Sequence, residues 1–402
     1  MPLVTQTFNH KTLMRIAIVI AFVQFTNALE YMALTPVFAF MAEGFSVPVS
    51  FSGYVSGMYT LGAVLSGIVA FYCIDLFNKK QFLLTNMMLL GALTFLSTLT
   101  THFDILLALR FCAGAVGGTT MGVGMSILIN YAPANLRGKM LATVIASFSL
   151  VSIVGMPAIL FLCTHYGWHT APGLISSLCL LSLPLIIFII PRDTAPSGVK
   201  RNLSIDAQTL LFASCTALVQ FSPMLIIPIL APLMTQYMGA QQNLLPLLFL
   251  SGGIAGYLST KITGMLTSRL SALMLATTST LFLVASLLIP AMGYHNVFLF
   301  ITLFLGASYS RLVCASSVAV QYPEDEQRAS FTSLQTAMMY LITTLAFFLS
   351  SLLLPDQGIT TQNLNRLLVV SALAASVFPV MVIILQKKLA KRTIPSDHFI
   401  ID

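Results

Sequence analysis

Two side chains of this sequence combine charge with a position where water is scarce. Glu30 is an acid inside an otherwise apolar stretch from about Met14 to Met41, and Arg110 is a base inside another apolar stretch. A carboxylate in hydrocarbon costs several kcal/mol, so it is expected to have a partner, a proton or a substrate. Measured from the predicted helix ends, Glu30 lies about 16 Å and Arg110 about 9 Å deep, a gap that two long side chains can bridge.

Pairing of Glu30 with Arg110 would give this site a way to exchange a proton. Arg110 would hold Glu30 ionised, whereas separation of the pair, or departure of a cationic substrate, would leave a buried carboxylate that favours protonation. Gln24, Asn27 and Tyr31 lie near Glu30 on the same stretch and favour a polar cavity that binds substrate. The pattern predicts a proton-coupling pair, and the alternative is a permanent ion pair that only fixes helix packing.

A second buried base, Arg311, has no acid within the spans of its own half of the chain. It lies about 22 Å from the outer end of its predicted helix, near the middle of the membrane. A water-filled cavity that receives a carboxylate or phosphate would explain an unpaired guanidinium there. The alternative is that Arg311 bonds backbone carbonyls or pairs with Glu30. We therefore expect Arg311 to bind an anionic or zwitterionic substrate.

Gln220 belongs to an apolar segment that is unusually rich in proline, with Pro223, Pro228 and Pro232 following it. Proline removes a helical hydrogen bond and clashes with the preceding turn, so this density predicts a kinked or broken helix. Helices interrupted at membrane depth often line transport pathways. Gln220 is therefore a further candidate for substrate binding.

The elements that must position these residues are membrane-spanning helices. Hydrophobic residues make up 57% of the 402 residues and charged residues only 8%, values outside the range of soluble globular domains. About 20 apolar residues cross a bilayer, and twelve such stretches can be placed. They run roughly over 14–41, 50–73, 81–101, 104–130, 139–163, 169–190, 207–237, 243–266, 270–290, 296–321, 330–354 and 363–386.

Basic residues predict the orientation of these spans. Lys and Arg of the short connections gather on one side, whereas on the other side only Arg366 lies near a helix end. Because basic residues favour the cytoplasmic side, both termini are expected in the cytoplasm, with the chain a multi-pass protein of the inner membrane. The net charge of +7 reflects this bias and attraction to anionic lipids, so no nucleic-acid partner is expected.

The connection between the sixth and seventh spans divides the chain nearly in two. We predict an N-terminal six-helix bundle over 1–190, a cytoplasmic linker over 191–206 and a C-terminal bundle with a short tail over 207–402. A weak repeat supports the division, because Tyr131 and Arg137 recur 191 positions later as Tyr322 and Arg328. The fold class is thus an all-α membrane protein of two pseudo-symmetric halves, with a site between them.

The connection after the second span resembles the loop signature of the major facilitator superfamily. Asp75, Asn78, Lys79 and Lys80 fit its pattern of an acid, then Gly or Asn, then two basic residues, whereas Leu76 replaces the usual basic residue after the acid. The resemblance implies that Asp75, Lys79 and Lys80 form a gate that holds the inner ends of the two halves together. The alternative is an ordinary acid at a helix end.

The N-terminal half also resembles the drug:proton antiporter branch of that superfamily, with an acid in helix one, a Gly, Tyr, Gly pattern in helix two and an arginine with glycines in helix four. The C-terminal half matches mainly by topology. In helix five only Gly155 and Pro157 remain of a motif that normally has several glycines around a Gly-Pro pair. The matching residues are Glu30, Gly53, Tyr59, Gly62, Arg110, Gly114, Gly117 and Gly118, with Pro133, Arg137 and Gly138 in the connection after helix four.

This resemblance implies a proton-coupled transporter that works by alternating access and exports its substrate, with Tyr59 at the substrate site and Arg137 at the gate. The substrate would be a drug, a metabolite or a siderophore. The alternative within transport is an importer of amino acids, nucleosides or a siderophore. From another class, a transport-dead sensor or an enzyme remains open, although no paired acids, Ser-His arrangement or metal set is visible.

The expected energy source is the proton gradient. No phosphate-binding motif points to ATP, and the cysteines show no metal-ligand spacing, so neither a cofactor nor a metal is expected. The expected partners are a small-molecule substrate and the lipid bilayer, with the protein a monomer.

Overall fold

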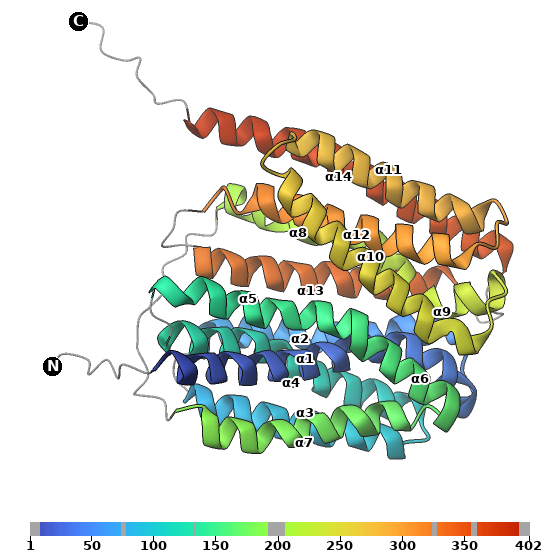
Figure 1. Ribbon diagram of the computed structural model, residues 1–402. Helices are drawn as coiled ribbons and strands as arrows, with labels where there is room; N and C mark the ends of the chain where they lie inside the picture. The colour runs from blue at the N-terminus through green and yellow to red at the C-terminus, as the bar shows by residue number, and fades with distance from the viewer. Residues whose placement is uncertain are drawn as a thin grey trace, which may run out of the picture.

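The protein is a bundle of long helices that run roughly side by side (Figure 1). The computed structural model describes residues 9–73, 78–131, 134–191, 206–323, 328–354 and 360–393. Over these ranges the chain forms helices and connections with no β-strand. Twelve of the helical segments are long and apolar enough to cross a membrane. The predicted all-α membrane fold is thereby confirmed.

The N-terminal half contains six of these spans. The fifth span is built from α5, a π-helical turn η4 and α6, whereas each of the others is a single helix. Two short 3₁₀ turns, η1 (Ala42–Phe45) and η2 (Val49–Phe51), lie between the first and second spans. The helices are α1 (His10–Met41), α2 (Ser52–Cys73), α3 (Lys79–Leu99), α4 (Phe103–Tyr131), α5 (Ala134–Leu150), η4 (Val151–Gly155), α6 (Met156–Tyr166) and α7 (Thr170–Ile189).

The C-terminal half contains the other six, and its first span is broken. Pro223 lies inside α8, and the helix breaks after Ile226 into a 3₁₀ turn that contains Pro228, a further turn that ends at Pro232 and a π-helical turn. The break was predicted from the proline density. The helices are α8 (Ala207–Ile226), η5 (Ile227–Ile229), α9 (Leu230–Pro232), η6 (Leu233–Tyr237), η7 (Gln242–Leu244), α10 (Leu245–Leu266), α11 (Ala272–Ala291), α12 (Val297–Ala319), α13 (Arg328–Leu353) and α14 (Thr361–Thr393).

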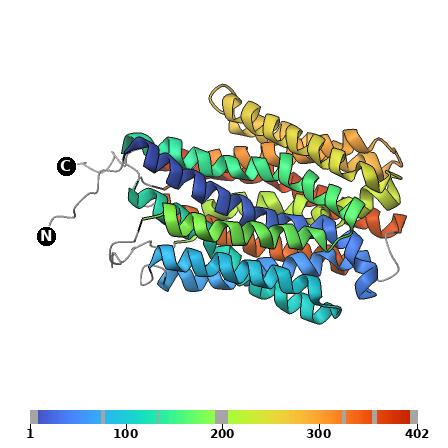
Figure 2. The same ribbon diagram turned by 60° about the horizontal axis from the view of Figure 1, so that its bottom comes forward.

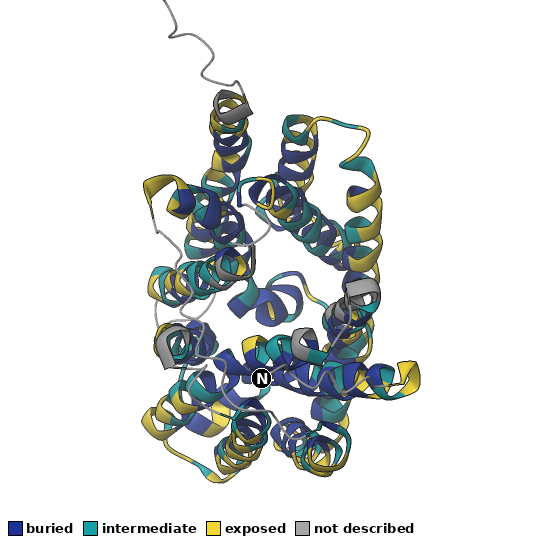
Figure 3. Ribbon diagram, turned by 90° about the vertical axis from the view of Figure 1, so that its left-hand side faces the viewer, coloured by how far each residue is buried: buried dark blue, intermediate teal, exposed yellow. Residues whose placement is uncertain are grey.

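The two halves repeat the same packing. In the N-terminal half α2 packs on α4, α4 on α3, and α3 on α7; in the C-terminal half α10 packs on α12, α12 on α11, and α11 on α14. The halves then meet through two related pairs, α2 with α13 and the η4–α6 segment with α10. Figure 3 shows the halves end-on, with exposed positions on the outside of the bundle. The predicted boundaries at 190 and 207 stay a prediction, because 192–205 lies outside the described residues.

The start of α1 and the end of α14 lie at the same end of the bundle, which we call the terminal face (Figures 1 and 2). Because α1 begins there, the start of α2 at Ser52 lies at the opposite face. Near that start, Ser52 Oγ donates to Pro228 O at 2.6 Å and Ser351 Oγ donates to Ser50 O at 2.6 Å. About two turns further in, Thr344 Oγ1 donates to Thr60 Oγ1 at 2.8 Å. These bonds tie the halves together on the side away from the termini.

Glycine lets α2 and α4 approach backbone to backbone. A Cβ atom added at Gly114 would stand 1.8 Å from the carbonyl oxygen of Tyr59, and one added at Gly62 would stand 2.1 Å from the carbonyl oxygen of Phe111. Small residues are the usual means of close helix contact in membranes, where lipid supplies no hydrophobic drive for association. This contact fixes the position of Tyr59 and Arg110, which are on the two helices involved.

Gly114→Ala should therefore separate α2 from α4 and destabilise the protein by about 1–3 kcal/mol, the usual cost of overpacking. Gly122 is the matched control, because it is exposed on the same helix and a Cβ there meets nothing within 4 Å. The measurement is the thermal unfolding temperature of each purified variant. Equal unfolding temperatures for Gly114→Ala and Gly122→Ala would contradict the close contact.

Candidate functional site

Glu30 and Arg110 meet in the interior of the N-terminal half. Arg110 Nη1 of α4 donates to Glu30 Oε1 of α1, and the two side chains are 1% and 0% exposed. Glu30 is carried eleven residues before the end of α1, and Arg110 seven residues after the start of α4, so antiparallel helices bring the two to similar depth. The structure places together the two residues that the sequence singled out. Their part in proton coupling stays a prediction.

The pair leaves hydrogen-bonding capacity unused. Thr94 Oγ1 of α3 donates to Glu30 Oε1 at a long 3.5 Å. In the described part of the chain, Glu30 Oε2 and Arg110 Nε and Nη2 are buried without a hydrogen-bond partner. Buried polar groups of this kind are costly unless they are hydrogen-bonded. A proton or a ligand that binds these atoms would therefore remove that cost. Thr94 was not predicted from the sequence, because a threonine in an apolar stretch carries no distinctive signal.

Aromatic side chains lie between the Glu30–Arg110 pair and the C-terminal half. The guanidinium carbon of Arg110 lies 4.7 Å from the ring centre of Tyr59, a cation–π arrangement. The ring of Tyr31 lies 5.4 Å from Tyr59 and 6.2 Å, edge-on, from Tyr340 of α13. Tyr31 and Tyr340 are half-buried. A chain of three tyrosines thus connects Arg110 to the C-terminal half; Tyr340 was not predicted, because no charge marks it.

The amides of α1 lie on the face that meets α4. Gln24 Nε2 donates to Thr120 O at 3.1 Å, while its Oε1 is buried without a partner in the described chain. Asn27 Oδ1 is likewise buried and unpartnered. A Cβ at Gly117 would stand 2.8 Å from that oxygen and 2.2 Å from the Tyr59 hydroxyl, so both polar groups meet at this glycine. Asn27 thus lies beside Tyr59, which contacts both Tyr31 and Arg110, and Gln24 lies three residues before Asn27 on the same helix.

The two candidates from the C-terminal half lie elsewhere. Gln220 is half-buried on α8, one turn before Pro223. Arg311 is fully buried on α12, where Nη2 donates to Ala375 O of α14 at 3.0 Å and the guanidinium carbon lies 5.4 Å from the ring centre of Phe378. This geometry matches the alternative in which Arg311 bonds a backbone carbonyl. Substrate binding by Gln220 and Arg311 stays a prediction.

The predicted gate is only partly described. Asp75 lies outside the described residues, and Arg137 is on α5 with a side chain that is also outside them. Lys80 Nζ donates to Ile187 O at 2.7 Å and to Ile190 O, so it satisfies carbonyls at the end of α7. Lys79, at the start of α3, is 8% exposed. Gating by these four residues stays a prediction.

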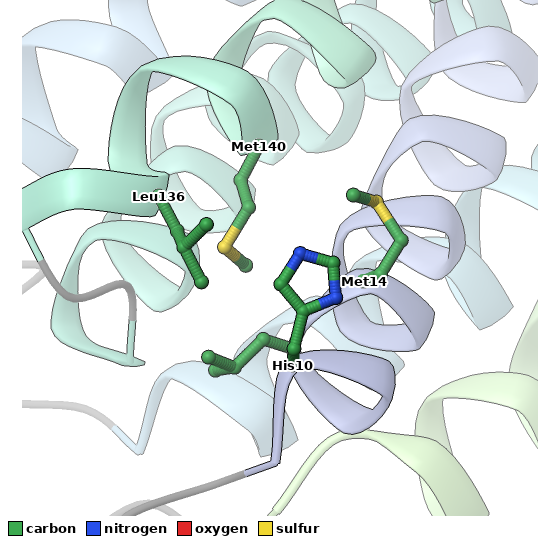
Figure 4. A pocket seen from close by; sticks show the side chains of 5 residues that line it. His10, Met14, Leu136 and Met140 are labelled. Atoms are coloured by element: carbon green, nitrogen blue, oxygen red, sulfur yellow. The ribbon is translucent and has the colours of Figure 1, made fainter.

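A small crevice opens where α1 and α5 begin, at the terminal face (Figure 4). Its labelled walls are His10, Met14, Leu136 and Met140. His10 is about 30 Å along α1 from Glu30 at the helical rise, so this crevice is not part of the site around the ion pair.

Comparisons with known proteins show what this chain is similar to. The model of the Major Facilitator Superfamily matches residues 20–209. The N-terminal half of the chain thus matches the major facilitator superfamily, in agreement with the resemblance of its sequence motifs. The chain is similar to the niacin transporter NiaP of Acinetobacter baylyi, 28% identical over 48% of this chain and 40% of that protein. It is also similar to the 4-hydroxybenzoate transporter PcaK of the same organism, 25% identical over 44% of this chain and 39% of that protein.

The fold is shared over nearly the whole chain with a solved structure. A bacterial homologue of the human lysosomal transporter Spinster, in an inward-facing and unoccupied conformation, superposes with a TM-score of 0.72 at 14% identity, covering 96% of this chain and 99% of that one. NiaP and PcaK match over less than half of their own length. NiaP and PcaK are both named as transporters, in agreement with the prediction that this chain is not an enzyme. The protein is a multi-pass protein of the inner membrane.

Removal of one partner of the Glu30–Arg110 pair should leave an uncompensated charge or donor in the interior. We expect Glu30→Gln and Arg110→Met each to destabilise the protein, Glu30→Gln by about 3–5 kcal/mol. The double variant should recover most of that loss, because the remaining groups are neutral. The measurement is a double-mutant cycle on thermal unfolding, with Thr94→Val as a neighbour control expected to lose about 1 kcal/mol or less. Additive losses would show that the two side chains do not interact.

Proposed function

We propose that this protein is a proton-coupled secondary active transporter that moves a small aromatic carboxylate across the inner membrane by alternating access. The observation that carries the proposal is the buried Glu30–Arg110 pair, which has unpartnered atoms in the described chain and lies against Tyr59, one of a group of tyrosines drawn from both halves. A charged pair kept in hydrocarbon is by default functional. Two halves related by a repeat, with a site where they meet, are the frame for alternating access.

The substrate class is inferred from the chemistry of the site. Arg110 has two nitrogens without a partner in the described chain, and guanidinium groups bind carboxylates through paired hydrogen bonds. The rings of Tyr31 and Tyr340 stand 6.2 Å apart, edge to face, and are half-buried, so an aromatic ring can pack against them. NiaP and PcaK are named for niacin and 4-hydroxybenzoate, both aromatic carboxylates, which supports the same class for this chain.

Charge balance then couples the substrate to a proton. A substrate carboxylate that pairs with Arg110 displaces Glu30, whose carboxylate is left buried without its cation. Desolvation favours the protonated form of such a group. Substrate and proton would therefore occupy the site together and cross together, which is symport. An inward proton gradient would drive import, the alternative that the sequence analysis left open.

Export is the second candidate, and the free oxygen of Glu30 favours it. A cationic substrate would pair with Glu30 Oε2, which is buried and unpartnered in the described chain. Substrate and proton would then compete for the same carboxylate, which is antiport. This is the direction that the resemblance to drug:proton antiporters implied, and multidrug, metabolite or siderophore efflux would belong to it. The charge of the substrate thus sets the direction of transport.

Alternating access requires the bonds at the face opposite the termini to open. Ser52–Pro228, Ser351–Ser50 and Thr60–Thr344 join the halves there. If the termini are cytoplasmic, as the basic residues predict, these bonds close the outer side and the substrate leaves toward the cytoplasm. Asp75, Lys79, Lys80 and Arg137 would then hold the opposite end in the other state, and the protein would work as a monomer.

The test is transport by purified protein in proteoliposomes. Labelled nicotinate and 4-hydroxybenzoate are expected to accumulate faster when the external solution is more acidic than the lumen. Glu30→Gln should lose this acceleration and yet keep exchange of labelled for unlabelled substrate at equal pH, since exchange moves no net proton. Gly122→Ala, far from the pair, should behave as the wild type.

Labelled ethidium is the cationic arm of the same experiment. Ethidium uptake driven by an acidic lumen, and lost in Glu30→Gln, would establish antiport in place of symport. Transport of either class that keeps its full proton dependence in Glu30→Gln would overturn Glu30 as the coupling residue.

A further inference from the structure

A cavity of about 140 Å³ lies between α8 and α14, away from the ion pair. Its walls are apolar side chains of the two helices, among them Leu218, Val377 and Phe378. Leu218 is 42% exposed and Val377 is 54% exposed, so the mouth lies on the surface that faces lipid. Ser222 and Ser371 hydrogen-bond at 3.0 Å just beyond it and hold the two helices together. A cavity of this size can hold a ring or a short alkyl chain.

Arg311 lies directly behind one wall of this cavity. Its guanidinium carbon is 5.4 Å from the ring centre of Phe378, which lines the cavity and is itself 2% exposed. One nitrogen donates to Ala375 O, whereas Nε and Nη1 are buried without a partner in the described chain. The ring of Phe378 thus stands between a lipid-facing cavity and two unused donors.

The described residues from 207 to 393 contain no Asp or Glu that could pair with Arg311. The acids of this stretch are Glu324, Asp325, Glu326 and Asp356, which lie outside the described residues. Arg311 lies about 21 Å from the Val297 end of α12 and about 12 Å from the Ala319 end. A guanidinium this deep is costly without an anion. No described residue of this half supplies that anion.

We propose that the cavity between α8 and α14 binds a lipophilic monocarboxylic acid from the membrane, whose carboxylate pairs with Arg311 once the Phe378 ring turns aside. The acid enters in its neutral form, and its proton is released to bulk water when the carboxylate pairs with Arg311. The acyl chain lies along Val377 and Leu218 and continues into lipid. Depth decides against a phospholipid, because its phosphate stays at the membrane surface, whereas a protonated carboxylic acid is neutral and dissolves in hydrocarbon. This assigns Arg311 to a site on the lipid face, separate from Glu30 and Arg110.

The experiment is equilibrium dialysis of labelled octanoate against the purified protein in nanodiscs, with binding to protein-free nanodiscs subtracted. Saturable binding is expected for the wild type. Arg311→Gln should weaken it at least tenfold, because glutamine can still donate to Ala375 O but carries no charge. Unlabelled octanoate should displace the label, whereas 1-octanol and octylammonium, which have the same chain without the negative charge, should not.

A second variant keeps the test independent of Arg311. Ala374 lines the cavity and is half-buried, so Ala374→Phe fills the space while leaving the guanidinium intact and should also abolish binding. The double variant Glu30→Gln/Arg110→Met, which keeps most of the stability and has no charge at the other site, should bind octanoate like the wild type. This separates the cavity from the transport site whatever the fate of the transport proposal. Absence of saturable binding, equal binding by Ala374→Phe, displacement by 1-octanol, or loss in a folded double variant would each overturn the proposal.

Discussion

The rest of this structure depends on holding a carboxylate and a guanidinium together in hydrocarbon. Glu30 and Arg110 are both fully buried, and either charge without the other would destabilise the fold. The constraint acts on the backbone first, because antiparallel α1 and α4 must bring the two residues to depths that their side chains can bridge. Any change that moves either helix along its axis would leave an unpaired charge inside the bundle, so the pair specifies the register of the N-terminal half.

Packing of the neighbouring helix follows from the same constraint. Gly62 and Gly114 allow α2 to touch α4, which places the ring of Tyr59 over Arg110. Tyr31 and Tyr340 continue this aromatic contact across the interface between the halves. A change in the charge of the pair therefore acts on side chains that both halves share. This continuity gives a physical route from protonation of Glu30 to movement of one half against the other.

The sequence predicts those features that depend on local composition. Hydropathy alone predicts the twelve spans, and the three prolines at 223, 228 and 232 predict the broken seventh span. Both predictions succeed because hydropathy and the helix-breaking effect of proline each act within a few residues. The partners of a side chain depend instead on how each helix is rotated about its axis. Glu30 and Arg110 could be paired from depth, since charge leaves few choices in hydrocarbon. Arg311 could not be placed, because its partner is the backbone of Ala375, and neither Thr94 nor Tyr340 carries a charge that marks it.

Infrared difference spectroscopy of the protein in nanodiscs, recorded on addition of nicotinate, tests the central claim most directly. If a carboxylate substrate takes Arg110 from Glu30, the C=O stretch of a protonated carboxyl group appears on binding in the wild type and is missing in Glu30→Gln. If nicotinate binds to the wild type with no such band, or if Glu30→Gln shows the same band, Glu30 does not take up the proton and the coupling account is wrong.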